Sequence, residues 1–149
     1  MLFYNHYMNN LAIRLCGGTV LGALFGALCF YGFGTQPNLT PELKVLTVWS
    51  TSNFMMWDII VNRAVVGFTV GLAGFLTIHP LFGFKLPAFF RGFAMGISAT
   101  LTLALGILIN GATPEAVTAF WMTLIAGGII GLIIDVILTK IAGEGSDLK

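Results

Sequence analysis

Charged residues are scarce in this chain. They make up 9% of its 149 residues, and hydrophobic types account for 57%. An ordinary soluble domain carries about 25% charged residues, so too few are present here to cover a water-exposed surface. The mean hydropathy of +0.94 favours a lipid bilayer instead. We therefore predict an all-α integral membrane protein.

Neither the net charge nor the cysteine content points to a particular partner or compartment. Seven basic and six acidic residues give a net charge of +1, so we expect no nucleic-acid partner. Cys16 and Cys29 lie on one predicted helix, about 20 Å apart at roughly 1.5 Å per residue, which is too far for a disulfide bond. We expect both to be small buried apolar residues.

The motifs of common enzyme, metal and cofactor sites are missing as well. His6 and His79 are far apart, and neither belongs to a Glu-x-x-His or Cys-x-x-Cys spacing, so we expect no metal and no haem. The chain has no phosphate-binding loop, no nucleophile elbow and no carboxylate pair placed for acid–base chemistry. We therefore predict a non-enzymatic protein without a cofactor.

What the chain does contain is four long apolar runs. They predict transmembrane helices at about residues 12–33, 54–78, 88–109 and 117–141, each long enough for a hydrocarbon core of about 30 Å. The first run could instead be a signal peptide, but it exceeds the usual apolar length of about 7–15 residues. The sequence predicts a single domain, residues 1–149, with a frayed tail at 143–149.

A short segment between the first two runs is predicted to form an element of its own. Thr40-Pro41-Glu42 has the hydroxyl, proline and acid of a helix start. One helix from there to Ile78 would be about 56 Å long at roughly 1.5 Å per residue, longer than a whole bilayer of about 40–45 Å. We therefore predict a short interfacial helix at about residues 41–49, lying on the membrane surface.

Glycines recur at four-residue spacing on the predicted spans, and this spacing lets two helix backbones approach closely. The predicted packing positions are Gly18, Gly22 and Gly26 on the first span, Gly67 and Gly71 on the second, Gly92 and Gly96 on the third, and Gly127 and Gly131 on the fourth. The third span carries a further row of small residues, Ala94, Ser98, Thr102 and Gly106. The sequence thus predicts a glycine-packed four-helix bundle.

Thr-Pro-Glu occurs twice, at residues 40–42 and 113–115, and each copy precedes a predicted helix. The repetition suggests two duplicated helical hairpins arranged around a pseudo-axis, as in many transporters. The same tripeptide also suits any well-capped helix start, and the glycines do not align at one offset between the halves. Duplication and independent capping therefore both remain open.

The basic residues predict the orientation in the membrane. With four spans the two termini share one side, which collects Arg14, Lys85, Arg91, Lys140 and Lys149, against Lys44, or Lys44 and Arg63, on the other. Because positive residues favour the cytoplasmic side, we predict that both termini are cytoplasmic. Three tryptophans, Trp49, Trp57 and Trp121, fall near the external interface, where such rings anchor helices.

Charged residues inside the predicted spans are the candidate functional positions, because a charge at the bilayer centre costs about 2.5–3.5 kcal/mol. Counting residues places Asp135 and Arg91 near the cytoplasmic boundary, so the two can meet, and Arg14 is a second candidate partner for Asp135. An ion pair that fixes the helix packing is one interpretation. A proton or cation carrier is the other, and it requires water access and a counter-charge that can dissociate.

Arg63 lies on the glycine-bearing face of the second span, in its outer third. Asp58 is better placed beside Asn62, one helical turn away, than beside Arg63. We therefore expect Arg63 to reach another helix or Glu115, or to extend its guanidinium group to the outer surface. A site for an anion or a lipid headgroup is the functional alternative.

Two classes of function fit these patterns. Because every span carries small residues at helical spacing, we predict a structural or accessory subunit that packs against itself or other membrane proteins, surrounded by membrane lipids. The alternative is a small oligomeric channel or transporter for an ion or small solute. Its path would be lined by Arg63, Asn62, Arg91 and Asp135, with Arg14 beside them.

Overall fold

A computed structural model describes residues 2–37, 41–79, 81, 83–109 and 111–148 of the chain. Its elements are α1 (Leu2–Gly34), α2 (Pro41–Leu46), α3 (Phe54–Ala73), α4 (Ala88–Ile107), α5 (Pro114–Ala142) and the short 3-10 helix η1 (Gly145–Leu148). Four of these helices, α1, α3, α4 and α5, are long and apolar enough to cross a membrane. The prediction of a helical protein with four membrane-spanning segments is confirmed at this level.

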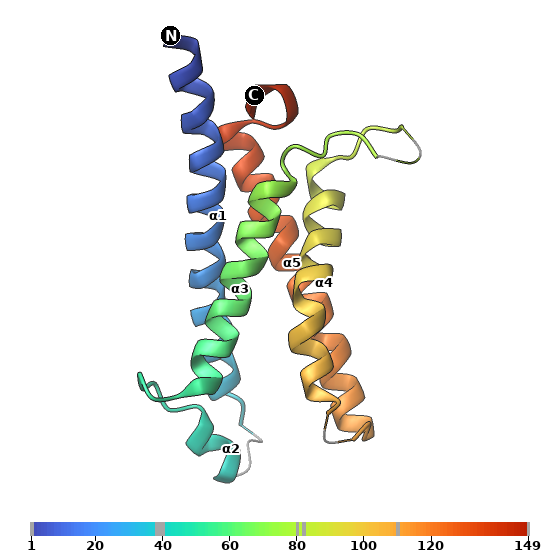
Figure 1. Ribbon diagram of the computed structural model, residues 1–149. Coiled ribbons are helices and arrows are strands. Elements are labelled where there is room, and N and C mark those ends of the chain that lie inside the picture. The colour runs from blue at the N-terminus through green and yellow to red at the C-terminus, as the bar shows by residue number, and fades with distance from the viewer. Residues whose placement is uncertain (1, 38–40, 80, 82, 110, 149) are drawn as a thin grey trace.

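The four long helices form two antiparallel pairs (Figure 1). α3 packs along α1 and α5 packs along α4, and the contacts between the two pairs are less extensive. Both chain termini lie where the pairs converge, and the pairs diverge toward α2 and the α4–α5 connection. We call the first the closed end, which contains Arg14 and Asp135, and the second the open end, which contains Asp58 and Glu115.

Side-chain caps set the starts of α3 and α5. Asn53 Oδ1 accepts a hydrogen bond from the Met56 N–H at 3.3 Å, and Thr113 Oγ1 accepts one from the Ala116 N–H at 3.2 Å. α5 therefore begins at Pro114, earlier than the predicted residue 117. Thr40, the expected cap of α2, lies outside the described residues.

Other helix bounds differ from the predicted ones. α3 ends at Ala73 instead of residue 78, because the chain turns at Gly74 and then forms an isolated antiparallel bridge between Ile78 and Lys85. Elsewhere, α1 begins at Leu2 rather than residue 12, α2 ends at Leu46 rather than 49, and α4 ends at Ile107 rather than 109. Apolar composition predicts where a helix can run, whereas caps and turns decide where it stops.

The C-terminal tail is docked on the bundle, in contrast to the predicted fraying. Gly145–Leu148 form η1, and the Gly145 N–H donates to the carbonyl of Gly74 at 2.9 Å. The side chain of Leu148 is buried. Gly143 and Gly145 have φ angles of +74° and +61°, which favour glycine, and these angles fold the chain back over the closed end.

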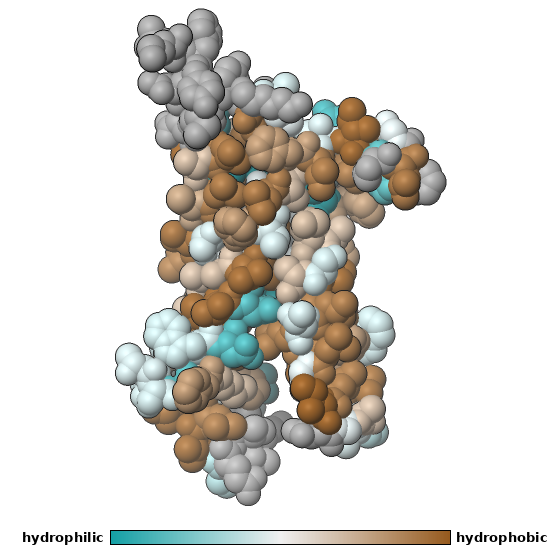
Figure 2. Space-filling model, viewed as in Figure 1, coloured by the Kyte–Doolittle hydropathy of each residue, from teal (hydrophilic) through white to brown (hydrophobic). Residues whose placement is uncertain are grey.

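The buried apolar core lies between the two pairs. Val66 and Val70 of α3 pack against Ile130, Ile134 and Leu138 of α5. Outside this core, large apolar side chains are exposed on all four long helices, and Figure 2 shows them as a broad brown surface. Such a surface suits contact with lipid. A hydrophilic patch interrupts it between the pairs, on the side of the open end.

Candidate functional site

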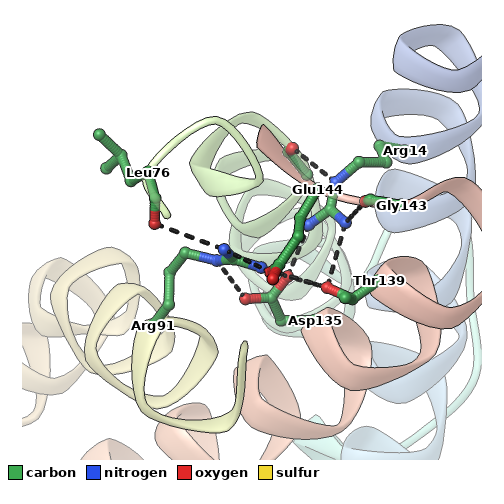
Figure 3. A network of polar contacts seen from close by, with 8 residues as sticks. Arg14, Leu76, Arg91, Asp135, Thr139, Gly143 and Glu144 are labelled. Carbon is green, nitrogen blue, oxygen red and sulfur yellow. Dashed lines mark hydrogen bonds and ion pairs between the residues drawn. The ribbon is translucent and has the colours of Figure 1, made fainter. Parts of the chain in front are cut away.

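Two arginines bind one buried aspartate at the closed end (Figure 3). Arg91 of α4 makes two contacts with Asp135 of α5, Nε to Oδ2 at 2.7 Å and Nη2 to Oδ1 at 3.0 Å. Arg14 of α1 donates from Nη2 to Oδ1 at 2.6 Å, and the side chains of Arg14 and Asp135 are 0% exposed. The Thr139 hydroxyl accepts from Arg14 Nη1 at 3.3 Å and from Arg91 Nη2 at 3.1 Å. The two arginines therefore hold the aspartate from two sides, and its side chain is shielded from solvent.

Further acceptors surround both guanidinium groups. Arg14 Nη1 donates to the carbonyl of Gly143 at 2.7 Å, and Arg14 Nε donates to the carbonyl of Gly71 at 3.3 Å. Arg91 Nη1 forms an ion pair with Glu144 Oε2 at 2.9 Å. We call Arg14, Arg91, Asp135 and Glu144 the closed-end cluster. Its two positive and two negative charges balance.

This geometry supports the ion-pair interpretation of Asp135 over the carrier interpretation. A carrier needs water access and a counter-charge that can dissociate. Asp135 is fully buried, and both arginines contact it within 2.7 Å. Bidentate arginine contacts of this kind fix the relative position of the groups that they join. The cluster thus ties α1, α4, α5 and the C-terminal tail together.

Arg63 occupies a second polar position, nearer the middle of the bundle. Its side chain is 3% exposed, so it does not extend to the outer surface. Arg63 Nη1 donates to Thr100 Oγ1 of α4 at 2.7 Å, and Nε has no hydrogen-bond partner. No carboxylate of a described residue, Glu115 included, forms an ion pair with it. Beside it, Asn62 donates to the carbonyl of Ala99 at 3.4 Å, while Asn62 Oδ1 is buried without a partner.

The nine glycines predicted to mediate packing all face the other helix of their own pair. A Cβ atom at any of them would meet atoms of that helix. At Gly18 and Gly67, which oppose each other in the α1–α3 pair, the added atom would overlap a backbone carbonyl. Gly96 and Gly127 oppose each other in the α4–α5 pair. A Cβ atom at Gly96 would overlap the carbonyl of Gly127, and one at Gly127 would overlap the Thr100 side chain. Within each pair, backbone therefore lies against backbone.

A cavity of about 1050 Å³ lies at the open end, and all four long helices contribute to its walls. Its lining is largely apolar, with Met55, Leu103 and Met122 among the side chains. The polar members are Gln36, Asp58, Glu115, Thr118 and Thr123. Asp58 and Glu115 are exposed and form no ion pair with a described residue. The cavity thus combines apolar walls with two carboxylates that no cationic side chain of the described residues pairs with.

The predicted path residues and the cavity do not coincide. Arg14, Arg91 and Asp135 are brought together at the closed end, and Arg63 and Asn62 lie in the layer between that cluster and the cavity. The sequence does not predict the two cavity acids as site residues: it places Asp58 beside Asn62, and it gives Glu115 as an acid in a helix start and as a possible partner of Arg63. Their shared position near the N-terminal ends of α3 and α5, which begin at the same end of the bundle, is a pattern that could have indicated them.

No three His, Cys, Asp or Glu side chains of the described residues lie close enough together to hold a metal ion. The candidate site therefore consists of the open-end cavity, the layer of Asn62 and Arg63 beyond it, which we call the Arg63 layer, and the closed-end cluster.

Comparisons with known protein families, with curated proteins and with solved structures find no match for this chain, so no relative supplies a function for it.

Proposed function

We propose that this chain is a non-enzymatic multi-pass membrane protein of the channel or transporter class, which admits a small solute between its two helix pairs. The observation that carries the proposal is the cavity of about 1050 Å³ at the open end. A large, mostly apolar cavity with a few convergent polar groups is the usual form of a small-molecule site. Its entrance would face the external side if both termini are cytoplasmic, with α2 on the membrane surface beside it.

The packing of the four helices supports movement of the two pairs as units. Within each pair, glycines bring the backbones into contact, and such a contact leaves little room for sliding. Between the pairs, side chains meet at the closed end, whereas a cavity separates them at the open end. The two hairpins also have the same order and direction (Figure 1), which suits transport by rocking of two related halves.

The closed end supplies the contacts that such a motion would have to break. Arg14 of α1 binds Asp135 of α5, and Arg91 of α4 donates to the carbonyl of Leu76, which follows α3, at 3.4 Å. Both contacts join one pair to the other. On this proposal the closed-end cluster is a gate, and Arg63 lies between the gate and the cavity.

Two glycines without neighbours provide the test. A Cβ atom added at Gly106, which lines the cavity, or at Gly32, which is not among the described lining residues, would meet no atom within 4 Å. Gly106→Phe should fill part of the cavity without disturbing helix contacts, and Gly32→Phe is the matched control. Flux into liposomes would be measured with labelled potassium, chloride, a small organic cation and a small organic anion.

We expect wild type and Gly32→Phe to transport at least one of these solutes, and Gly106→Phe to lose most of that flux. Equal flux through the two variants would contradict a path through the cavity. Absence of flux with every solute would count against the channel or transporter class and would favour an accessory role.

An accessory or structural subunit is the second candidate, and a specific surface supports it. The row Ala94, Ser98, Thr102 and Gly106 on α4 is exposed, so another helix could approach this face closely. Native mass spectrometry of the protein released gently from its membrane would report its partners directly. A stable complex with a different protein that Ser98→Leu abolishes would support this candidate, and a free monomer would argue against it.

A further inference from the structure

We propose that the open-end cavity binds an organic cation with a single positive charge and an apolar body. This inference rests on the proposed function, because the cation would be the solute that enters between the helix pairs. It names a ligand class that the cavity's charge, size and lining favour together.

The charge of the cavity favours a cation. Asp58 enters from α3 and Glu115 from α5, so each helix pair supplies one carboxylate, and the lining residues that the structure describes include no lysine or arginine. Neither carboxylate forms an ion pair or a side-chain hydrogen bond with any described residue. Carboxylates in a recess with low-dielectric walls concentrate the negative potential there. A bound cation would supply the counter-charge that the described part of the chain does not.

The size and the walls of the cavity favour an organic ligand over a bare ion. Its volume of about 1050 Å³ is enough for a molecule of drug size, whereas a metal ion would leave most of it empty. Met55, Leu103 and Met122 contribute flexible apolar side chains that adapt to an irregular ligand surface. The ligand therefore needs apolar groups for these walls and one positive group for the carboxylates.

Asn62 and Arg63, the layer beyond the cavity, limit how far the positive group of the ligand can move from the open end into the bundle. On α3, Asn62 follows Asp58 by one turn and Arg63 follows Ile59 by one turn, so both lie on the cavity-lining side of the helix, further from the open end. The buried guanidinium of Arg63 repels a cation that approaches it. The positive group should therefore remain between Asp58 and Glu115 and not pass the Arg63 layer in this conformation.

The surroundings of the cavity also suit an amphiphilic cation. Trp57 precedes Asp58 and Trp121 precedes Met122, and both rings are about half exposed. Tryptophans in this position are typical of the interface between lipid and water, where apolar cations accumulate. The ligand would thus be concentrated at the depth where the cavity opens.

The first experiment compares two ions of nearly equal size and shape and opposite charge, tetraphenylphosphonium and tetraphenylborate. Binding of each labelled ion to the protein in phosphatidylcholine nanodiscs would be measured by equilibrium dialysis, with empty nanodiscs subtracted. We expect saturable binding of tetraphenylphosphonium near one ion per chain and no saturable binding of tetraphenylborate. Equal binding of the two ions would overturn the inference.

Carboxylate variants locate the site. Asp58→Asn and Glu115→Gln should each weaken tetraphenylphosphonium binding about tenfold, and the double variant should weaken it further, because each removes one charge contact with the bound cation. Lys140→Gln changes an exposed charge at the opposite end, outside the closed-end cluster, and should leave the affinity unchanged. Unchanged affinity of the double variant, with the protein still folded by circular dichroism, would reject the two carboxylates as the cation site.

A labelling experiment separates failure of this inference from failure of the proposed function. Thr123→Cys, in a background with Cys16→Ser and Cys29→Ser, places a thiol in the cavity wall. A cationic methanethiosulfonate reagent should modify it at least about tenfold faster than an anionic one. Equal rates would show that solutes enter but the cation preference is wrong. No reaction with either reagent would reject access to the cavity and hence the proposed function too.

Discussion

The contacts within each helix pair and the contacts between the pairs are of different kinds. Within the α1–α3 and α4–α5 pairs, glycines place backbone against backbone. Between the pairs, side chains meet, and they include an apolar core as well as the arginines and their acceptors. Apart from the Arg91–Asp135 ion pair within the α4–α5 pair, the first kind of contact depends on the absence of side chains and the second on their presence.

This difference has a physical basis in the membrane. Lipid tails are as apolar as leucine side chains, so helices do not associate in lipid merely to bury apolar surface. Close backbone approach provides dispersion contacts inside a pair, and charged or hydrogen-bonded side chains provide specific contacts between pairs. We infer that the pairs are the rigid units and that their interface is the adjustable part.

The largest effect is expected when the interface between the pairs loses its central anion. Asp135→Ala would leave Arg14 and Arg91 buried without a carboxylate between them. Removal of one partner from a buried pair typically lowers the free energy of unfolding by about 3–5 kcal/mol. Unfolding by SDS titration in mixed micelles would measure the change.

Asp58→Ala is the matched control for this prediction, because Asp58 is exposed and forms no ion pair with a described residue. Its effect on the free energy of unfolding should stay within about 0.5 kcal/mol. Similar losses for the two variants would mean that the closed-end cluster is not what holds the pairs together.

The next effect concerns contact within a pair. In Gly67→Ala the added methyl group would overlap the backbone carbonyl of Gly18. That carbonyl cannot move away unless α1 separates from α3. Overpacking of this kind should lower the free energy of unfolding by about 1–3 kcal/mol, and thermal unfolding in detergent would also detect it. Gly106→Ala enters open space and should be neutral or slightly stabilising. If both variants behave alike, the backbone contact between α1 and α3 is not close.

A smaller effect is expected at the unpaired arginine. Arg63→Met removes a buried charge that has no carboxylate partner among the described residues, at the expense of its hydrogen bond to Thr100. These two changes oppose each other, so the free energy of unfolding should change by no more than about 1 kcal/mol. If Arg63→Met lowers the free energy of unfolding as much as Asp135→Ala does in the same SDS titration, the buried charge of Arg63 is stabilised by its surroundings as well as the charges of Arg14 and Arg91 are.

The smallest effect is expected at the edge of the closed-end cluster. Glu144 pairs with Arg91 but is 22% exposed, so Glu144→Gln should lower the free energy of unfolding by about 0.5 kcal/mol. The same variant should increase proteolysis of the C-terminal tail, because the ion pair helps to dock it. Unchanged proteolysis would assign the docking to Leu148 and to the backbone hydrogen bond between Gly145 and Gly74 instead.

Several features of the site could be predicted because they depend on depth along a single helix. Counting residues placed Arg14, Arg91 and Asp135 near one boundary, and the structure brings them together although Arg14 and Asp135 are 121 residues apart. The docking of the tail could not be predicted in this way. It depends on Arg14 and Gly74, which belong to other elements and supply the hydrogen-bonding partners for the backbone after Ala142.

By itself the sequence determined the helical class, the four apolar spans and the faces that carry glycine, because hydropathy and the helical period are local properties. Only the tertiary structure decided which helices share each glycine contact, that Arg63 is buried without a carboxylate partner among the described residues, and that Asp58 and Glu115 line one cavity. Periodicity defines the face of a helix but not the helix opposite to it. That choice depends on how all four helices pack at once, so a role that depends on neighbours from two pairs is not encoded in any one segment.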